Sequence, residues 1–106
     1  MRIYTLEIAD KELKKLPLVV RKRFLIYFEE IENNESLSVT EFKKLSGTEL
    51  FEFRVKDQVG IFRAIAGKIH NKIYILAVFK KKSQKTPKNQ LEKAKRRLSQ
   101  IKNQIL

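Results

Sequence analysis

Basic side chains on neighbouring predicted strands are the residues of this sequence best suited to chemistry on a phosphodiester. Arg54 and Arg63 fall on two strands that a short turn joins, and Glu52 shares a strand face with Arg54. Three lysines follow at the end of the next strand: Lys80, Lys81 and Lys82. If the strand faces register, these groups converge on one surface. Guanidinium groups suit the dispersed charge of a pentacoordinate phosphorus. RNA supplies its own nucleophile, the 2′-hydroxyl, so the arrangement predicts RNA cleavage without a metal ion.

The same residues also suit a structural role. On an antiparallel sheet with one covered face, arginines and lysines normally occupy the face in water. Glu52 beside Arg54 and Lys56 can simply balance charge. Position in the sequence does not choose between these two interpretations.

The sequence lacks the residues that other kinds of catalytic site require. The chain has no Cys and one His, which excludes disulfides, thiolate metal sites and histidine clusters. His70 and Asn71 form a predicted turn, where His70 is an ordinary turn residue rather than part of a catalytic triad. No glycine-rich phosphate loop, zinc-binding spacing or nucleophile elbow is present. An enzyme with this sequence is therefore expected to work with Lys and Arg and to need no cofactor.

The basic charge is concentrated towards the C-terminus. Lys and Arg number 24 against 12 acids, and residues 80–106 hold ten bases and one acid, Glu92. Such asymmetry predicts an anionic partner on one side of the molecule, which RNA, DNA, an acidic protein or an anionic membrane would satisfy. No apolar run approaches the ~18 residues of a membrane span. The N-terminus lacks the zones of a signal peptide, so a cytoplasmic protein is expected.

Hydrophobic periodicity predicts one α+β domain over residues 1–106 with the order β-α-α-β-β-β-α. Apolar residues alternate in the strands and recur at spacings of three and four in the helices. The predicted strands cover 2–8, 50–56, 60–66 and 72–80, and the predicted helices cover 11–16, 18–33 and 87 to near the end. Residues 34–49 are predicted to be a loop with one helical turn around 40–45. The sheet is expected to be small, mainly antiparallel and packed against helices.

Several segments resemble the phage-derived HigB-type branch of the RelE/HigB toxins. Phe42-Lys43-Lys44-Leu45-Ser46-Gly47, followed by Leu50-Phe51-Glu52-Phe53-Arg54, is similar to their K-x-L-x-G…L-W-E-L-R segment. Ile61-Phe62-Arg63-Ala64-Ile65 matches their Y-R-I strand. The sharpest match is Phe79-Lys80-Lys81-Lys82-Ser83-Gln84-Lys85-Thr86-Pro87, which resembles F-x-K-K-x-Q-K-T-P between a strand and a helix. The resemblance covers residues 42–98.

The resemblance implies a RelE-like fold, with helices on one face of the sheet, in the toxin of a type II toxin–antitoxin system. It implies cleavage of messenger RNA in the ribosomal A site, leaving a cyclic phosphate and a 5′-hydroxyl. The implied partner is a cognate antitoxin with a helix-turn-helix domain, similar to HigA, through which alone the toxin reaches operator DNA. Relatives of the same fold that inhibit gyrase imply an alternative, a toxin without catalysis. A basic nucleic-acid-binding regulator is a further alternative.

The resemblance also assigns roles to residues. Arg54 and Arg63 would bind the scissile phosphate, and Glu52 would be a base or a structural partner of Arg54. The basic cluster after the last strand, Lys80, Lys81 and Lys82, would bind phosphate or the leaving group. The matched basic residues that would contact RNA are Lys56, Lys81, Lys85, Arg96 and Arg97.

Overall fold

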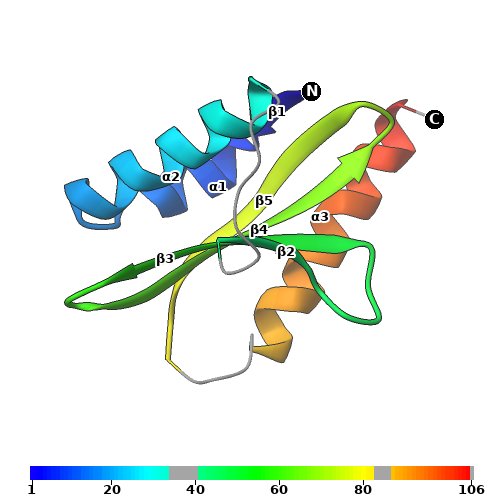
Figure 1. Ribbon diagram of the computed structural model, residues 1–106. Helices are drawn as coiled ribbons and strands as arrows, with labels where there is room; N and C mark the ends of the chain where they lie inside the picture. Colours follow the sequence, from blue (N-terminus) through cyan, green and yellow to red (C-terminus); the bar gives the residue numbers. More distant parts are fainter. Residues whose placement is uncertain (34–40, 83–86, 106) are drawn as a thin grey trace.

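The computed structural model describes residues 1–33, 41–82 and 87–105 and shows an α+β fold built on one five-stranded sheet (Figure 1). Its strands are β1 (Arg2–Thr5), β2 (Phe42–Lys44), β3 (Leu50–Asp57), β4 (Gly60–Ile69) and β5 (Lys72–Lys81). Its helices are α1 (Glu7–Lys14), α2 (Leu18–Glu32) and α3 (Lys88–Ile105). The strands lie in the order β1-β5-β4-β3-β2, and only β1 and β5 are parallel. The predicted α+β class and mainly antiparallel sheet are confirmed.

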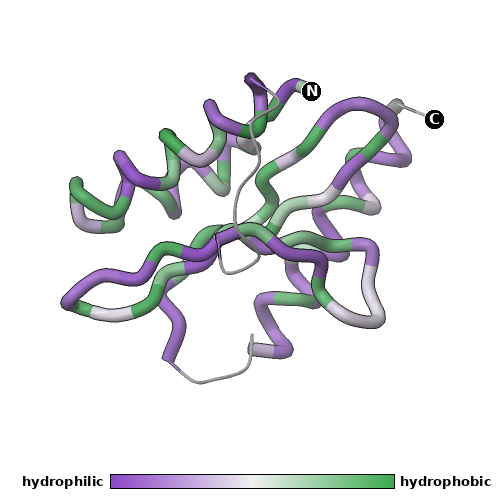
Figure 2. Tube along the Cα trace, in the orientation of Figure 1, coloured by the Kyte–Doolittle hydropathy of each residue, from purple (hydrophilic) through white to green (hydrophobic). Residues whose placement is uncertain are grey.

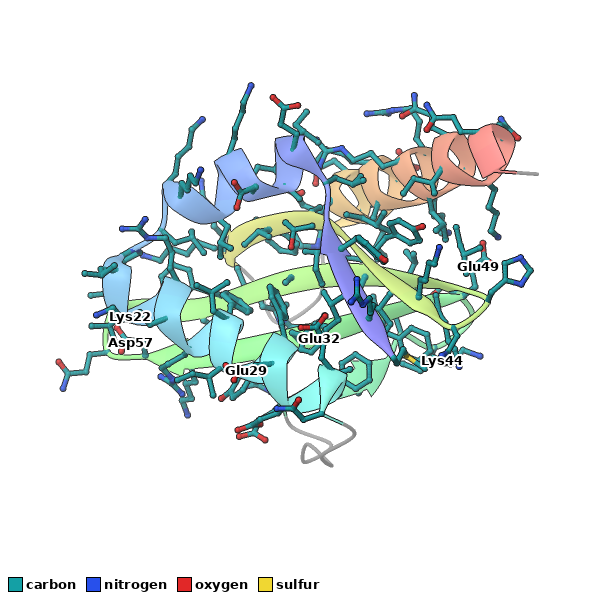
Figure 3. All side chains as sticks on the ribbon, turned by 90° about the horizontal axis from the view of Figure 1, so that it is seen from above. Lys22, Glu29, Glu32, Lys44, Glu49 and Asp57 are labelled. Carbon is teal, nitrogen blue, oxygen red and sulfur yellow. The ribbon has the colours of Figure 1, made fainter. Side chains whose placement is uncertain are left out.

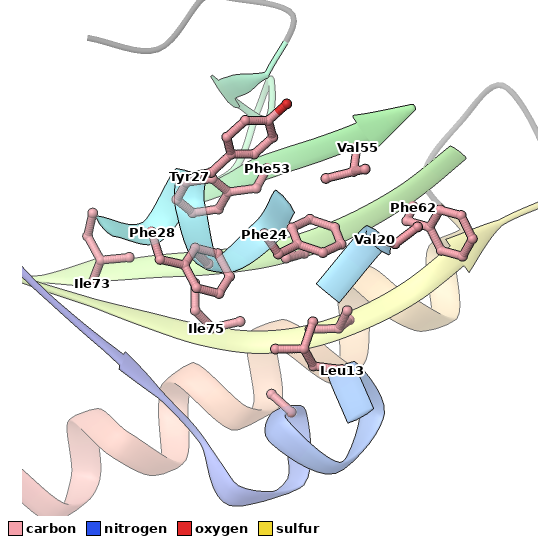
Figure 4. Close-up of a cluster of buried hydrophobic side chains, with 14 residues drawn as sticks. Leu13, Val20, Phe24, Tyr27, Phe28, Phe53, Val55, Phe62, Ile73 and Ile75 are labelled. Atoms are coloured by element: carbon pink, nitrogen blue, oxygen red, sulfur yellow. The ribbon is translucent and has the colours of Figure 1, made fainter. Parts of the chain in front are cut away.

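Helices α1 and α2 cover one face of the sheet. Their buried side chains meet the buried residues of β3, β4 and β5 in a cluster rich in aromatic rings (Figure 4). At its centre the ring of Phe28 meets that of Phe53 edge-on, with the ring centroids 5.0 Å apart. This packing holds the strands that carry Arg54 and Arg63 against a rigid support.

Helix α3 covers the other face. Ala94 and Leu98 pack against the buried side chains of β4 and β5, and Gly67 allows the close approach. A Cβ atom at Gly67 would lie 2.7 Å from Leu98 Cδ1. The expectation that helices lie on one face only was therefore wrong. A continuous run of buried residues from Phe62 to Gly67 in β4 is typical of a strand covered on both sides.

Strand β2 lies where the sequence predicted a loop. It is three residues long, and its Phe42 packs against the rings of Phe51 and Phe53, with centroid distances of 5.4 and 4.5 Å. These contacts join residues that are nine and eleven positions apart, beyond the reach of local propensity, which therefore does not reveal the strand.

The first helix begins earlier than the sequence predicted. It starts at Glu7 rather than at residue 11, and β1 ends at Thr5 rather than at residue 8. Ala9 and Leu13, four residues apart, are the positions that α1 buries, whereas Ile8 is exposed. A short apolar stretch fits a strand period or a helix period about equally well, and the tertiary contacts select the helix. None of the helices within the described ranges has the length and apolar character to span a membrane.

A β-bulge in β5 changes which face its last residues occupy. The register with β4 shifts between Ile65 and Ala66, which pair with Ala77 and Ile75, so that Leu76 is the additional residue. An extra residue reverses the inward and outward alternation of everything that follows it. The two lysines at the end of β5, Lys80 and Lys81, are therefore placed by this bulge.

Candidate active site

Four strands place cations on the face of the sheet that α3 partly covers. Lys43 of β2 lies opposite Glu52, and Arg54 of β3 lies opposite Arg63 of β4. Lys81 of β5 lies opposite Ile61, which is two residues from Arg63 along β4, so Lys81 and Arg63 are diagonal neighbours on the same face. Neighbouring strands are about 4.8 Å apart, so these side chains share one small area. We call Lys43, Arg54, Arg63 and Lys81 the cationic face.

Because of the bulge, Lys80 and Lys81 each lie on the face of the sheet opposite to the one that regular alternation along β5 would give. Lys81 joins the cationic face, whereas Lys80 lies opposite Phe62, on the side of α1 and α2, with its Nζ 6.0 Å from the Phe62 ring centroid. Lys82 is exposed just after the strand, in the hydrophilic segment that leaves β5 (Figure 2). The prediction that Lys80 joins the sheet arginines was therefore wrong, and Lys81 takes that place.

Arg63 and Glu52 form a buried ion pair. Arg63 is 5% exposed and Glu52 is 1% exposed, and Nη1 of Arg63 donates a hydrogen bond to Oε1 of Glu52. The pair compensates for the direct opposition of Arg54 and Arg63, since like charges opposite each other in a sheet repel. The sequence offered Glu52 as a base or as a partner of Arg54. The structure gives it Arg63 as its partner, in a position that orients this guanidinium.

Arg54 lines a basic hollow at the edge of the sheet. The hollow holds about 330 Å³ and is lined by Arg23, Tyr27, Glu41, Arg54 and Lys56. Nη1 of Arg23 donates a 2.6 Å hydrogen bond to the carbonyl oxygen of Lys56, so α2 contributes a cation here. Neither Arg23 nor Lys43 was predicted as a site residue, because α2 was predicted to form core and residues 34–49 to form a loop with one helical turn. The available signal for Lys43 was the K-x-L-x-G segment, of which it is the first residue.

Lys81 has the most unusual environment of the cationic face. It is 9% exposed although it carries an ammonium group. Burial, together with the positive charges of Arg63, Arg54 and Lys43, lowers the pKa of Lys81, and Glu52 acts in the opposite direction. A lysine whose pKa is lowered releases its proton more readily, which suits a general acid.

Two of the predicted RNA contacts, in the middle of α3, are placed differently. Arg96 is exposed and available to an RNA backbone. Arg97 is buried: its Nη1 donates hydrogen bonds to the carbonyl oxygen of Leu76, at 2.6 Å, and to Oε1 of Glu12, at 3.2 Å. The prediction of Arg97 as an RNA contact was therefore wrong, because it joins α3 to β5 and α1. Lys85 lies outside the described residues.

Glu12 is the centre of this connection. Its carboxylate accepts hydrogen bonds from the Val78 backbone N–H and from Lys93 Nζ, both at 3.1 Å, as well as from Arg97. β1 pairs with β5 only as far as Ile75, so Glu12 and Arg97 satisfy backbone groups of β5 beyond the end of β1. Together they fix the segment that leads to Lys81.

The stability contributed by Glu12 is expected to be lost in acid. Burial raises the pKa of Glu12, but hydrogen bonds from Arg97, Val78 and Lys93 outweigh it and hold the pKa below the ordinary value of 4.5. The contribution is then fully present above pH 4.5 and falls as the pH drops through the lower, folded-state pKa. Urea unfolding at a series of pH values measures this loss. The free energies of unfolding of wild type and Glu12→Gln should differ most near neutral pH and become similar in acid. Glu7→Gln, which removes an exposed carboxylate, is the control, and a constant difference for Glu12→Gln would contradict the assignment.

Comparison with known proteins agrees with this architecture. The family described as phage derived protein Gp49-like (DUF891) matches residues 11–99. The search of curated proteins found no match. A chain of the RelB–RelE antitoxin–toxin complex from Methanococcus jannaschii is 25% identical, with a TM-score of 0.61 over 79% of this chain and 99% of that chain.

Two structures from E. coli share the fold at lower identity. A free mutant of the toxin RelE is 19% identical, with a TM-score of 0.65 over 92% of this chain and 96% of that chain. A chain of the intact RelBE toxin–antitoxin complex is 21% identical, with a TM-score of 0.55 over 77% of this chain and 98% of that chain. The chain therefore belongs to the phage-derived Gp49-like family, of the RelE/HigB type, and its fold is that of the RelE toxins.

Proposed function

We propose that this protein is the toxin of a toxin–antitoxin system and that it cleaves messenger RNA without a metal ion. The observation that carries the proposal is the cationic face, where cations from four strands share one small area of the sheet. The similarity to a chain of an antitoxin–toxin complex supports the toxin assignment.

In the proposed reaction the RNA 2′-oxygen attacks the adjacent phosphorus. The bond between O2′ and phosphorus forms, the bond between phosphorus and O5′ breaks, and the products carry a 2′,3′-cyclic phosphate and a 5′-hydroxyl. Arg54 and Lys43 stabilise the negative charge that grows on the phosphate oxygens, and Arg63, oriented by Glu52, adds to this field. Lys81 gives its proton to O5′ as that bond breaks, and the proton of the 2′-hydroxyl leaves to water.

The proposed partners follow from charge. A protein with a net charge of +12 is steered towards an acidic antitoxin and towards ribosomal and messenger RNA. The antitoxin is proposed to be a helix-turn-helix protein similar to HigA and to be the route by which the pair reaches operator DNA. Exposed Arg96 and Lys82 are proposed to contact the RNA backbone on the ribosome.

Induction of the protein in growing bacteria is expected to produce discrete breaks in translated messenger RNA within minutes. Primer extension maps the breaks, and the new 5′ ends should accept phosphate from a polynucleotide kinase because they carry hydroxyls. With purified ribosomes, cleavage should persist when magnesium is replaced by spermidine and chelator, provided that the ribosomes stay assembled. Intact transcripts together with a DNA-damage response would refute the proposal in favour of a gyrase-inhibiting toxin.

A second candidate function is an RNA-binding regulator that does not cleave. The buried ion pair of Arg63 favours this candidate, because a guanidinium that stabilises the fold through Glu52 is less accessible to a phosphate. This candidate predicts RNA affinity that falls steeply with salt, with unbroken transcripts. The same primer-extension experiment separates the two functions.

A further inference from the structure

Two cations and two tyrosines form a square array at the edge of the sheet, away from the cationic face. Arg2 pairs with Lys72, and Tyr4 pairs with Tyr74, in the parallel register of β1 and β5. Residues opposite each other in a register project to the same face, and Tyr74 packs against the cluster beneath α3, so all four lie on that face. We call Arg2, Tyr4, Lys72 and Tyr74 the tyrosine platform.

The rings of the platform are held in place but remain accessible. The ring centroids of Tyr4 and Tyr74 are 5.5 Å apart, with an angle of 25° between the planes. Tyr4 is 38% exposed, and Lys72 Nζ lies 5.8 Å from the centroid of its ring. In the described part of the chain, neither Arg2 nor Lys72 belongs to an ion pair. Among the described residues, no acid therefore neutralises either charge at ion-pair distance.

A hollow adjoins the platform. It holds about 390 Å³, and its lining combines apolar Ile69 and the ring of Tyr74 with the basic side chains of Arg2 and Lys72. This volume is within the range of small-ligand sites. An apolar and aromatic lining with a cationic rim fits a molecule in which a flat, neutral ring is joined to a negatively charged group, as the base and the phosphate are in a nucleotide.

We infer that the tyrosine platform binds a short segment of single-stranded RNA, with a base stacked on a tyrosine ring and the phosphates at Arg2 and Lys72. Sites that bind single strands combine a basic surface with aromatic rings on which bases stack. The ammonium of Lys72 now lies near the ring of Tyr4, and a stacked base would displace it towards the phosphate. The inference rests on the proposed function only in taking RNA as the ligand.

The platform and the cationic face bind separate RNA segments. Leu76, Ala77 and Phe79 lie between Tyr74 and Lys81 on β5 and belong to the cluster beneath α3. Helix α3 therefore occupies the sheet between the two sites. Tyr74 and Lys81 pair with Gly67 and Ile61 of β4, which are six residues apart, so the two sites are separated by roughly 20 Å along the strand. The platform thus anchors RNA at a distance from the scissile phosphate.

A binding experiment with an RNA that lacks the nucleophile tests the inference independently of cleavage. The probe is a fluorescent 2′-O-methyl oligoribonucleotide of about eight nucleotides, followed by anisotropy. Tyr4→Ala is expected to weaken binding about 5- to 100-fold, whereas Tyr4→Phe, which keeps the ring, stays close to wild type. Lys72→Ala should reduce the slope of log affinity against log salt by about 0.7.

Lys22→Ala is the matched charge control for Lys72→Ala. Lys22 is an exposed lysine on α2, over the opposite face of the sheet (Figure 3), so its removal should leave affinity and slope unchanged. Unchanged affinity in both Tyr4→Ala and Lys72→Ala would overturn the inference. An equal effect of Lys22→Ala and Lys72→Ala would also overturn it, because binding would then depend only on net charge.

Tyrosine signals give a second measurement that does not depend on variants. The chain has three tyrosines, and Tyr27 lines the hollow beside Arg54, so its signal reports RNA at that hollow and not at the platform. With ring-labelled tyrosine, the oligonucleotide should shift the NMR signals of Tyr4 and Tyr74, whether or not that of Tyr27 also moves. Shifts absent from Tyr4 and Tyr74 would contradict the inference even if a variant failed to fold.

The source of the RNA is identified by a photo-crosslinking side chain at position 4 in toxin bound to translating ribosomes. A crosslink to messenger RNA or to ribosomal RNA supports the inference and names the source. A crosslink to protein alone would show that the platform is a protein interface. If transcripts stay intact on induction but the oligonucleotide binds as expected, the proposed cleavage is refuted and the tyrosine platform is still supported.

Discussion

Replacing Lys81 with methionine is expected to lower the rate of RNA cleavage by about 10²- to 10⁴-fold while leaving the fold intact. The substitution keeps an unbranched side chain of similar length in a buried position and removes both the charge and the proton. The breaking bond to O5′ then loses its acid, and the phosphate loses one of the cations that stabilise its charge. Single-turnover cleavage of ribosome-bound messenger RNA measures this loss.

Lys80→Met is the matched control, since it makes the same chemical change one residue earlier. Lys80 lies beside Phe62 on the opposite face of the sheet, so its loss should change the rate by only a few-fold. Lys81→Arg separates charge from proton transfer: it should retain RNA affinity and lose rate, because an arginine does not release its proton near neutral pH. A large loss in Lys80→Met with normal rates in Lys81→Met would refute this active-site assignment.

Breaking the buried ion pair is expected to produce the largest loss of stability. Glu52→Leu leaves Arg63 charged and buried without its carboxylate, which should cost about 3–5 kcal/mol of unfolding free energy. For a domain of this size such a loss lowers Tm by roughly 15 °C or more. Urea unfolding at neutral pH and calorimetry provide the two measurements.

The double variant Glu52→Leu/Arg63→Met should recover most of that stability, because both charges are then replaced by apolar groups. Glu49→Gln is the surface control, because Glu49, just before β3, forms an exposed pair with Lys102 of α3 (Figure 3). Breaking this pair should cost less than about 1 kcal/mol. If Glu52→Leu is no more destabilising than Glu49→Gln, the ion pair does not hold the site together. A stable double variant that cleaves slowly would show that Arg63 contributes to catalysis as well as to the fold.

Much of the framework was predictable from short-range patterns. Strand β3 alternates Phe51, Phe53 and Val55 on the α2 side with Glu52 and Arg54 on the other, as its sequence indicates. Helix α3 buries Ala94 and Leu98, as their spacing indicates. These features follow from the residue periods of helices and strands, which depend only on neighbouring residues. Strand β2 and the early start of α1 were missed because distant packing decides them.

The amino-acid sequence by itself determined that basic side chains from neighbouring strands meet on one face, because β3 and β4 form a regular hairpin in which Arg54 must lie opposite Arg63. Only the tertiary structure decided which lysine joins them. A strand's side chains alternate with a period of two, so the single additional residue Leu76 reverses every later position and exchanges Lys80 with Lys81. The structure likewise decided that Arg97 is buried with Glu12, since this pair joins segments that only the folded chain brings into contact. Within the hairpin it decided that Glu52 bonds to Arg63, its diagonal neighbour, rather than to Arg54 on its own strand.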